Sequence, residues 1–380
     1  MAQATSSPDL PWHELPPSLT GATCKVYLYQ AGSLDLPEDL VLLPGPNEPN
    51  ESTKPKDQRD SSKRMVHLPD YVFFIEHTAT GDYYQFDLGM RTDMENLPPF
   101  VKDNVLPGKP CYPVAAGKLL KELGSEEQQP EKVKAVFFSH LHFDHIGDGA
   151  KEGFTNAELW VGPTACTYAR PGHPIDENGA VLSENLPMNG SRKIVEPSIS
   201  DGILKNAGDK RVGLVAKSKN EGKYEAVELR ETTWIGLGAF DRGFDVFGDG
   251  SAYLLDSPGH SAGHQMMLIR VKAHKSASGE EDDFVLLAGD CFHHPAILKD
   301  PKRTARPPYS KHCMHTDPEV AVDTIYRTRA LAERSNVWVV GAHDHSVGDG
   351  IGPGKQEIEG LVLLNDWKMK AWKKPLSARL

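Results

Sequence analysis

The chain has 380 residues, which is enough for one large domain or two ordinary ones with a sizeable buried core. Its formal net charge of -11 argues against broad binding of nucleic-acid phosphates or anionic membranes, because both require clustered Lys and Arg. No apolar run reaches the length of a membrane span, and the first residues lack the basic and apolar parts of a signal peptide. We therefore expect a cytoplasmic protein that binds a small molecule and neither nucleic acid nor membrane, with a homodimer left open.

The first half of the chain is predicted to be rich in strands. Residues 1–21 are rich in Pro, Ser and Thr and are expected to form a flexible tail before a single domain of residues 22–380. A polar stretch near residues 35–64 is interpreted as an insertion. Residues 114–123 have helical spacing, with Gly124 as a C-cap. The strand-like stretches are residues 24–30, 71–75, 83–86, 133–138 and 158–162.

The second half opens with a polar segment near residues 170–225 that is rich in Gly, Pro and Asn. Because it has little periodicity, we expect a long insertion without regular structure. Asp317 is a predicted N-cap for a helix that runs to about Arg334, and a closing amphipathic helix is expected over residues 358–373. The strand-like stretches are residues 253–255, 266–271, 284–288 and 337–340.

One short stretch concentrates metal-ligand side chains. Residues 139–147 read Ser-His-Leu-His-Phe-Asp-His-Ile-Gly and follow a buried strand directly. In an extended segment His140 and His142 point to the same side, while Asp144 and His145 lie on the turn beyond. Imidazole nitrogens and a carboxylate are suitable ligands for a borderline metal such as zinc. This one loop could therefore face two neighbouring ions.

Further ligand-type residues follow later strands. The turn Ser257 to His264 contains His260, Asp290 follows the strand of residues 284–288, and His343 follows the strand of residues 337–340. Each is a buried strand that ends in a possible ligand, which is how a scaffold places rigid ligands at one edge of a sheet.

Together these elements resemble the metallo-β-lactamase superfamily, and within it the lactonase and γ-lactamase-like branch. The resemblance rests on five elements in the order typical of the family, and it spans roughly residues 22–350. They are Asp87-Leu88-Gly89 after a strand, the H-x-H-x-D-H loop of residues 140–145, the block of residues 249–264, Gly289-Asp290 and Ala342-His343-Asp344. The family implies an αβ/βα sandwich, an α/β fold in which two mixed sheets pack face to face with helices outside.

The resemblance also implies a ligand set for two zinc ions, with iron or manganese left open by ligand type. Asp290 would bridge the two ions, and Asp144 could in addition orient the attacking water. Asp87 and His264 would fix the geometry of the ligands. The ligands of one ion would be His140, His142 and His260, and those of the other Asp144, His145 and His343.

His293 is a departure from the homoserine-lactonase branch, in which a tyrosine is expected three residues after the bridging carboxylate. If the backbone path is kept, His293 could hydrogen-bond the substrate carbonyl or protonate the leaving group. Five other histidines are expected to be structural, and His345 is expected to be an outer partner of the ligands. The structural set is His67, His77, His274, His312 and His315.

The implied function is a dinuclear zinc hydrolase that opens a small cyclic ester or amide, either a lactone or a γ-lactam, by attack of a metal-bound hydroxide. A thioesterase of the glyoxalase-II type shares almost all of these ligands and remains an alternative, as does weak β-lactamase activity. A nuclease is disfavoured by the acidic charge. A non-catalytic binding module is disfavoured because all seven expected ligands are present.

Overall fold

The described fold begins with two long antiparallel strands. The computed structural model describes residues 9–18, 20–45, 54–59, 63–274, 279–355 and 357–378. Strand β1 (Cys24–Pro37) pairs with β2 (Met65–His77) in antiparallel register, from Cys24 opposite His77 to Pro37 opposite Met65. The register shifts between Gln30 and Ser33, where Gly32 has a φ of +115° and a Cβ would lie 2.4 Å from the carbonyl oxygen of Tyr112. Glycine is therefore required at this bulge.

The first sheet has nine strands, in the order β15-β1-β2-β3-β5-β6-β7-β8, with β4 paired to β1. Its first strands are antiparallel, and from β3 to β8 the neighbours are parallel. The remaining strands are β3 (Asp82–Phe86), β4 (Cys111–Pro113), β5 (Val133–Phe137), β6 (Glu158–Trp160), β7 (Ile194–Pro197), β8 (Val227–Arg230) and β15 (Val362–Leu363).

The second sheet has six strands in the order β14-β13-β12-β11-β10-β9. All its pairs are antiparallel except β13 with β14, which are parallel and joined through helices α7 and α8. The strands are β9 (Ile235–Leu237), β10 (Phe240–Asp245), β11 (Ala252–Asp256), β12 (Gln265–Lys272), β13 (Asp283–Leu287) and β14 (Val337–Val340).

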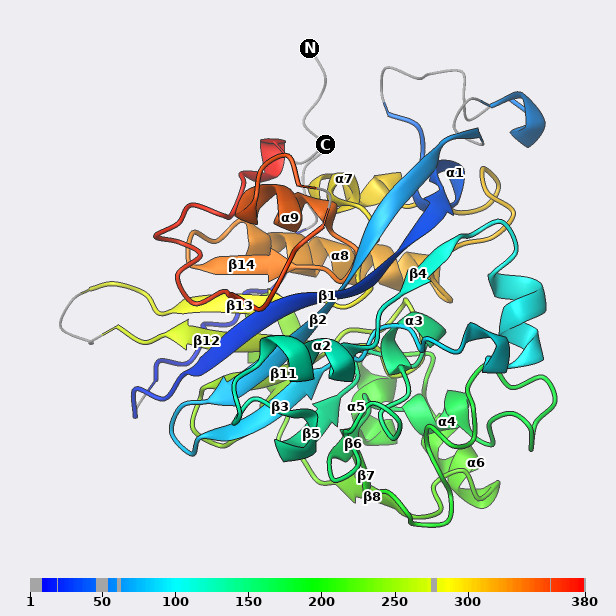
Figure 1. Cartoon of the computed structure of the whole chain (residues 1–380), viewed down its shortest axis with the longest axis horizontal. Coiled ribbons are helices and arrows are strands. Elements are labelled where there is room, and N and C mark those ends of the chain that lie inside the picture. The colour runs from blue at the N-terminus through cyan, green and yellow to red at the C-terminus, as the bar shows by residue number, and fades with distance from the viewer. Residues whose placement is uncertain are drawn as a thin grey trace.

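The helices lie outside the two sheets. In Figure 1, α7 to α9 gather beside β13 and β14, whereas α2 to α4 and α6 gather beside β3 to β8. Among the described residues, no helix is long and apolar enough to cross a membrane. The α-helices are α1 (Glu38–Val41), α2 (Ala116–Leu123), α3 (Phe143–Ile146), α4 (Ala165–Ala169), α5 (Asp201–Asn206), α6 (Leu214–Asn220), α7 (Pro295–Lys299), α8 (Pro318–Ala332) and α9 (His345–Ile351). Short 3-10 turns span Lys56–Gln58, Met94–Asn96, Pro130–Lys132, Pro301–Arg303 and Leu376–Ala378, and a π-helical turn spans Val101–Val105.

Three apolar clusters hold these layers together, and strand alternation sorts the side chains among them. Phe73 and Leu254 belong to the cluster between the two sheets. Their neighbours point the other way: Val72 and Phe74 pack with residues of α2 and α4, while Leu255 packs with residues of α8. Each large side chain buried in this way contributes about 1.5–3 kcal/mol. The predicted αβ/βα sandwich is thereby confirmed.

Most of the predicted elements are present, including the helix capped by Gly124 and the helix begun by Asp317. The predicted closing helix over residues 358–373 is wrong, because the chain there forms β15 and then turns. The side chain of Asn365 accepts from the backbone N–H of Val26 at 3.0 Å and donates to the carbonyls of Cys24 and Val271 at 2.9 Å. These bonds tie the segment to the sheets in a conformation that a helix could not keep.

The segment of residues 170–225 is not irregular as predicted. It contains α5, α6 and β7, and β7 continues the first sheet between β6 and β8. The buried guanidinium of Arg170 donates to four carbonyls along this segment, those of Leu186, Pro187, Lys223 and Glu225. A sequence pattern does not show these bonds because they form only when the chain folds back on itself.

Two further segments are more ordered than their composition suggests. The start of the expected insertion at residues 35–64 belongs to β1, since Asp35 lies opposite His67; residues 46–53 and 60–62 lie outside the described part. Within the expected tail, His13 exchanges backbone hydrogen bonds with Gly238 at 2.7 and 2.9 Å. Arg270 donates to the carbonyl of Pro16 at 2.6 Å. The segment around residues 13–16 therefore packs on the second sheet, and residues 1–8 lie outside the described part.

Glu152 should make the stability of the protein depend on pH. Its carboxylate accepts the backbone N–H groups of Gly117 and Asp148, and burial raises its pKa from 4.5 to about 7. Since the folded pKa is the higher one, the stability contribution is present below pH 4.5 and is lost as the pH rises to 7. The unfolding free energy of the wild type relative to Glu152→Gln, measured with urea, should therefore fall over this window. If the difference in unfolding free energy between the wild type and Glu152→Gln did not change with pH, the raised pKa of Glu152 would be contradicted.

Candidate metal centre

The seven predicted ligands lie at one edge of the two sheets, in the segments that follow β5, β11, β13 and β14, and two of them, Asp144 and His145, belong to the short helix α3. The parallel pair β13 and β14 shows how the sheets position them. Leu287 lies opposite Val340, and Asp290 and His343 each follow three residues later. The backbone N–H of Ala342 donates to the carbonyl of Gly289 at 3.0 Å, so the two loops are joined beyond the strands. Rigid strands therefore bring together side chains that are distant in sequence.

The loop after β5 is shaped by its neighbour after β3. Asp87 has a φ of +58°, a left-handed conformation that Asp tolerates better than most residues. Its Oδ1 accepts from the backbone N–H of Ser139 at 2.7 Å, and its Oδ2 lies 3.0 Å from Nδ1 of His145. The ring of His145 is therefore oriented with Nε2 towards the centre. Gly147, where a Cβ would lie 2.6 Å from Cβ of Leu88, ends α3.

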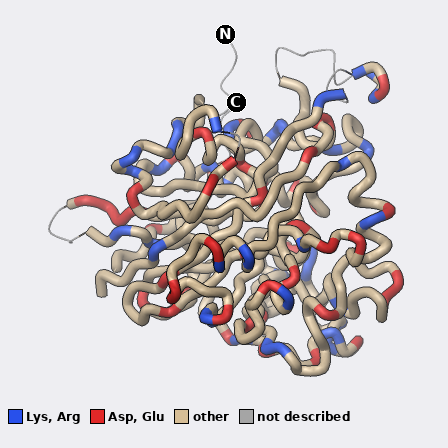
Figure 2. Tube along the Cα trace, viewed as in Figure 1, with Lys and Arg blue, Asp and Glu red and all other residues tan. Residues whose placement is uncertain are grey.

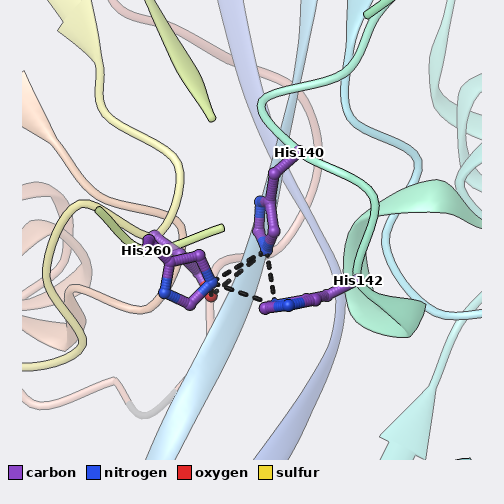
Figure 3. A group of neighbouring side chains, drawn as sticks. His140, His142 and His260 are labelled. Atoms are coloured by element: carbon purple, nitrogen blue, oxygen red, sulfur yellow. Dashed lines mark hydrogen bonds and ion pairs between the residues drawn. The ribbon is translucent and has the colours of Figure 1, made fainter. Parts of the chain in front are cut away.

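The first group consists of His140, His142, His260 and one oxygen of Asp290 (Figure 3). Nε2 of His140 lies 2.9 Å from Nδ1 of His142, and Nε2 of His260 lies 3.0 Å from each of these two atoms. Oδ2 of Asp290 lies 3.8 Å from Nε2 of His140 and 3.5 Å from Nε2 of His260. Three imidazole nitrogens thus face one another from two different sheets.

The second group consists of Asp144, His145, His343 and the other oxygen of Asp290. Oδ1 of Asp290 lies 3.1 Å from Nε2 of His145 and 3.2 Å from Nε2 of His343. Oδ2 of Asp144 lies 3.6 Å from Nε2 of His343. Nδ1 of His343 bonds to the carbonyl of Pro69 at 2.7 Å, which leaves Nε2 for the centre. Asp290 therefore presents one oxygen to each group.

The donor set of both groups fits divalent ions. In a tetrahedral zinc site with bonds of about 2.0 Å, ligand nitrogens lie about 3.3 Å apart, close to the spacing of the first group. In the second group, Nε2 of His145 and Oδ1 of Asp290 are buried and lie 3.1 Å apart, but neither atom makes a hydrogen bond of good geometry. Buried polar atoms without partners are costly, and a shared cation would satisfy both. Each group offers four N or O donors, which suits zinc.

The protonation states of the first group also favour a cation. Burial lowers the pKa of all three imidazoles below 6.5, so their lone pairs are available at neutral pH. Burial opposes ionisation of Asp290, but the neighbouring His145 and His343 outweigh it and hold the pKa of this carboxyl well below 3.8. The first group is thus three neutral donors beside a carboxylate.

The other residues singled out from the sequence have different positions. His264 bonds through Nδ1 to Oγ and to the carbonyl of Ser257, each at 2.9 Å, and its Nε2 is buried without a partner. Nε2 of His293 lies 3.1 Å from Oδ2 of Asp290, so this side chain touches the carboxylate that both groups share. Nε2 of His345 faces Nε2 of His294 at 3.4 Å.

Three of the five histidines expected to be structural bond to carboxylates away from the centre. His67 pairs with Asp35 at 2.7 Å and His77 with Asp249 at 2.8 Å. His274 pairs with Glu280 at 2.6 Å. His312 is exposed.

His315 and Asp70 lie near the centre and were not predicted there. His315 is buried with Nδ1 3.3 Å from Nδ1 of His260, and burial holds its pKa well below 6.5. Asp70 is fully buried, and neither of its carboxyl oxygens has a hydrogen-bond partner. Burial raises the pKa of Asp70 to about 8, against the opposing effect of His145 and His343. For Asp70 the only signal in the sequence was a carboxylate inside an apolar strand.

Comparison with known proteins identifies related chains. A sequence profile described as the metallo-beta-lactamase superfamily matches residues 111–152. "Gamma-lactamase MBL2" of Gibberella moniliformis (strain M3125 / FGSC 7600) is 32% identical over 215 residues, which cover 55% of this chain and 70% of that protein. "Cytochrome P450 monooxygenase mpaDE" of Penicillium roqueforti (strain FM164) is 29% identical over 98% of this chain. This chain spans only 39% of the length of that longer protein.

Among solved structures, similarity extends over most of the chain. An N-acyl homoserine lactone hydrolase with the product N-hexanoyl-L-homoserine bound at its catalytic metal centre aligns with a TM-score of 0.51. The alignment covers 86% of this chain and 94% of that one, at 19% sequence identity. At this level of identity the comparison establishes a shared fold.

Proposed function

The chain belongs to the metallo-beta-lactamase superfamily, and from this premise we propose that it is a metal-dependent hydrolase that opens a lactone or a γ-lactam at a centre of two zinc ions. The observation that carries the proposal is the placement of Asp290, with one carboxylate oxygen facing each of two four-donor groups. A carboxylate shared in this way suits two ions held close together.

Two ions held there would polarise the substrate carbonyl and lower the pKa of a water molecule to near neutrality. The chain itself supplies the geometry. Asp290 joins the two groups, and Asp144 lies within 3.6 Å of His343, where its carboxylate can accept a hydrogen bond from the attacking water. Asp87 and the carbonyl of Pro69 orient His145 and His343 through their Nδ1 atoms. Most of these side chains are buried, which limits access of bulk water to the reacting groups.

The proposed substrate class draws on the relatives and on the charge of the protein. The relative Gamma-lactamase MBL2 is named for the cleavage of γ-lactams. The N-acyl homoserine lactone hydrolase has the same fold as this chain. In the view of Figure 2, acidic and basic positions are interspersed along the trace. A small, uncharged cyclic ester or amide fits this surface better than a polyanion.

Metal analysis joined to a substrate panel tests the proposal. We expect about two zinc ions per chain and turnover of lactones or γ-lactams, with loss of activity in chelator and recovery on adding zinc. The panel should contain aliphatic and benzo-fused γ-lactams, lactones, β-lactams and thioesters. Turnover confined to thioesters would establish the glyoxalase-II-like alternative, and turnover confined to β-lactams would establish a β-lactamase. A single ion per fully active chain would contradict the two-zinc centre.

His293 is proposed as the group that protonates the leaving atom. It contacts Asp290 and therefore lies beside both groups, at the position where a homoserine lactonase is expected to have tyrosine. Replacing it with Phe keeps a planar ring and removes both nitrogens, so kcat should fall about tenfold or more while the metal content stays at the wild-type level. A kcat equal to that of the wild type, with two ions bound, would rule out the acid role.

A further inference from the structure

The two nitrogens of His260 have different partners. Nε2 faces His140 and His142 at 3.0 Å within the first group. Nδ1 faces Nδ1 of His315 at 3.3 Å, and the two rings meet edge to face with their centroids 5.2 Å apart. Both rings are buried, with 2% and 3% of their surface exposed. His260 therefore has one side towards the metal centre and the other against a second imidazole.

This arrangement determines where the protons lie. A cation in the first group takes the lone pair on Nε2 of His260, so the ring must carry its proton on Nδ1. Nδ1 then donates to His315, which must accept through its own Nδ1 and carry its proton on Nε2. Metal-binding histidines almost always donate their second N–H to a carboxylate, a carbonyl or water. Here an imidazole occupies that position.

The backbone holds the two histidines in register. The N–H of Thr316 donates to the carbonyl of His260 at 2.8 Å, and the N–H of Asp317 donates to the carbonyl of Gly259 at 2.9 Å. Asp317 is also the N-cap of α8 and accepts from the N–H of Val320 at 3.4 Å. The segment that carries His315 is thus fixed both to the start of a 15-residue helix and to the loop of His260.

Close packing at Gly259 makes this contact tight. Gly259 has a φ of +122°, and a Cβ there would lie 2.3 Å from the backbone nitrogen of Ala321 in α8. Only glycine allows the loop to approach the helix so closely. His260 and His315 therefore cannot separate without moving the first turn of α8.

A third ion is the competing interpretation, since His260, His293 and His315 also bring three ligand atoms within 4.8 Å of one another. Such an ion would need the lone pair on Nδ1 of His260 while the first group uses the lone pair on Nε2. His260 would then have to lose both ring protons. A hydrogen bond from Nδ1 needs no such deprotonation, so we favour the hydrogen bond.

We propose that His315 is a positioning residue that fixes the tautomer and the ring orientation of His260, and through them the affinity of the first group for its ion. The proposal rests on the two-metal function proposed above. Its test measures metal binding, which needs no substrate. A failure to find the right lactone or lactam would therefore leave the result for His315 intact.

The test compares four variants with the wild type by competition for Zn²⁺ with a chromophoric chelator. His315→Leu removes the acceptor, and zinc affinity at one of the two sites should fall about 10–100-fold while the other site keeps its affinity. His315→Asn places a carbonyl oxygen near the position of Nδ1 and should restore affinity to within a few-fold of the wild type. His315→Gln places its carbonyl further out and should bind about as weakly as His315→Leu. His312→Leu alters an exposed histidine of the same segment and should bind as the wild type does.

Three results would overturn the proposal. The first is a folded His315→Leu protein that binds both zinc ions as tightly as the wild type. The second is an equal loss of zinc affinity in His315→Asn and His315→Gln, which would show that His315 acts by packing. The same comparison tests the proposal if His315→Leu does not fold. The third is a wild-type stoichiometry of three ions per chain that falls to two in His315→Leu, because His315 would then be a ligand.

Discussion

Asp290→Asn is expected to remove most of the activity, because one substitution takes a donor from both metal groups. The amide keeps the shape of the side chain but loses the negative charge, and its nitrogen is not a ligand. Zinc content should fall from two ions to one or fewer per chain. The fall in kcat should exceed the 10–100-fold that is typical when only an outer partner of a ligand is lost. Inductively coupled plasma mass spectrometry and steady-state kinetics measure the two effects.

The choice of Asp290 over the other ligands follows from its position between the groups. Its Oδ1 lies near His145 and His343, whereas its Oδ2 lies near His140 and His260. Burial disfavours its charge, but the neighbouring His145, His343 and His293 favour the carboxylate and hold its pKa well below 3.8. Removing the charge weakens every one of these interactions at once.

Asp349→Asn is a suitable control, because Asp349 lies on α9 just after the loop of His343 and its side chain is 61% exposed, with Oδ2 3.9 Å from Nδ1 of His345. Its zinc content and kcat should equal those of the wild type. Asp290→Asn with two tightly bound zinc ions and wild-type kcat would show that the two groups do not share this carboxylate, and the proposed centre would have to be abandoned.

The candidate site could be predicted because its signals are local. The spacing of His140, His142, Asp144 and His145 can be recognised within one loop, and His260, Asp290 and His343 each follow a strand that its apolar residues reveal. Strand ends also predict that these residues meet at one edge, since neighbouring parallel strands end together. The sandwich fold could also be predicted, because the same apolar strands are recognisable and the motifs resemble those of a family with that fold.

His315 could not be assigned in this way. It precedes α8 in an irregular segment, and nothing in its neighbours along the chain marks it as different from His312. Its contact with His260 depends on backbone hydrogen bonds between two segments 55 residues apart. The short strand β7 and the segment around Asn365 were missed for the same reason, because distant polar side chains determine their conformation. Local periodicity carries no information about such bonds.

Asp256→Ala is expected to cause the largest loss of stability, about 3 kcal/mol, because it removes the fully buried carboxylate of a network and leaves Asp209 to pair with Arg211 and Arg242. Asp256 ends β11, four residues before His260, and its side chain is fully buried. It accepts from Arg211 at 3.0 and 2.7 Å and from Arg242 at 2.7 Å. Arg211 lies between α5 and α6, so Asp256 joins the second sheet to the segment that follows β7.

Urea unfolding measures this loss as a lower midpoint with an unchanged m value. Asp323→Ala is the matched control, since Asp323 pairs with Arg327 at 2.7 Å but is 52% exposed, and such pairs contribute about 0–1 kcal/mol.

The pH dependence of the unfolding free energy gives a second check. Burial opposes the charge of Asp256, but Arg211 and Arg242 hold its pKa below 3.8, so its contribution is present above pH 3.8 and is lost as the pH falls towards the folded pKa. The difference in unfolding free energy between the wild type and Asp256→Ala should therefore shrink in acid. Equal losses of unfolding free energy in Asp256→Ala and Asp323→Ala would show that the buried network adds nothing beyond a surface ion pair.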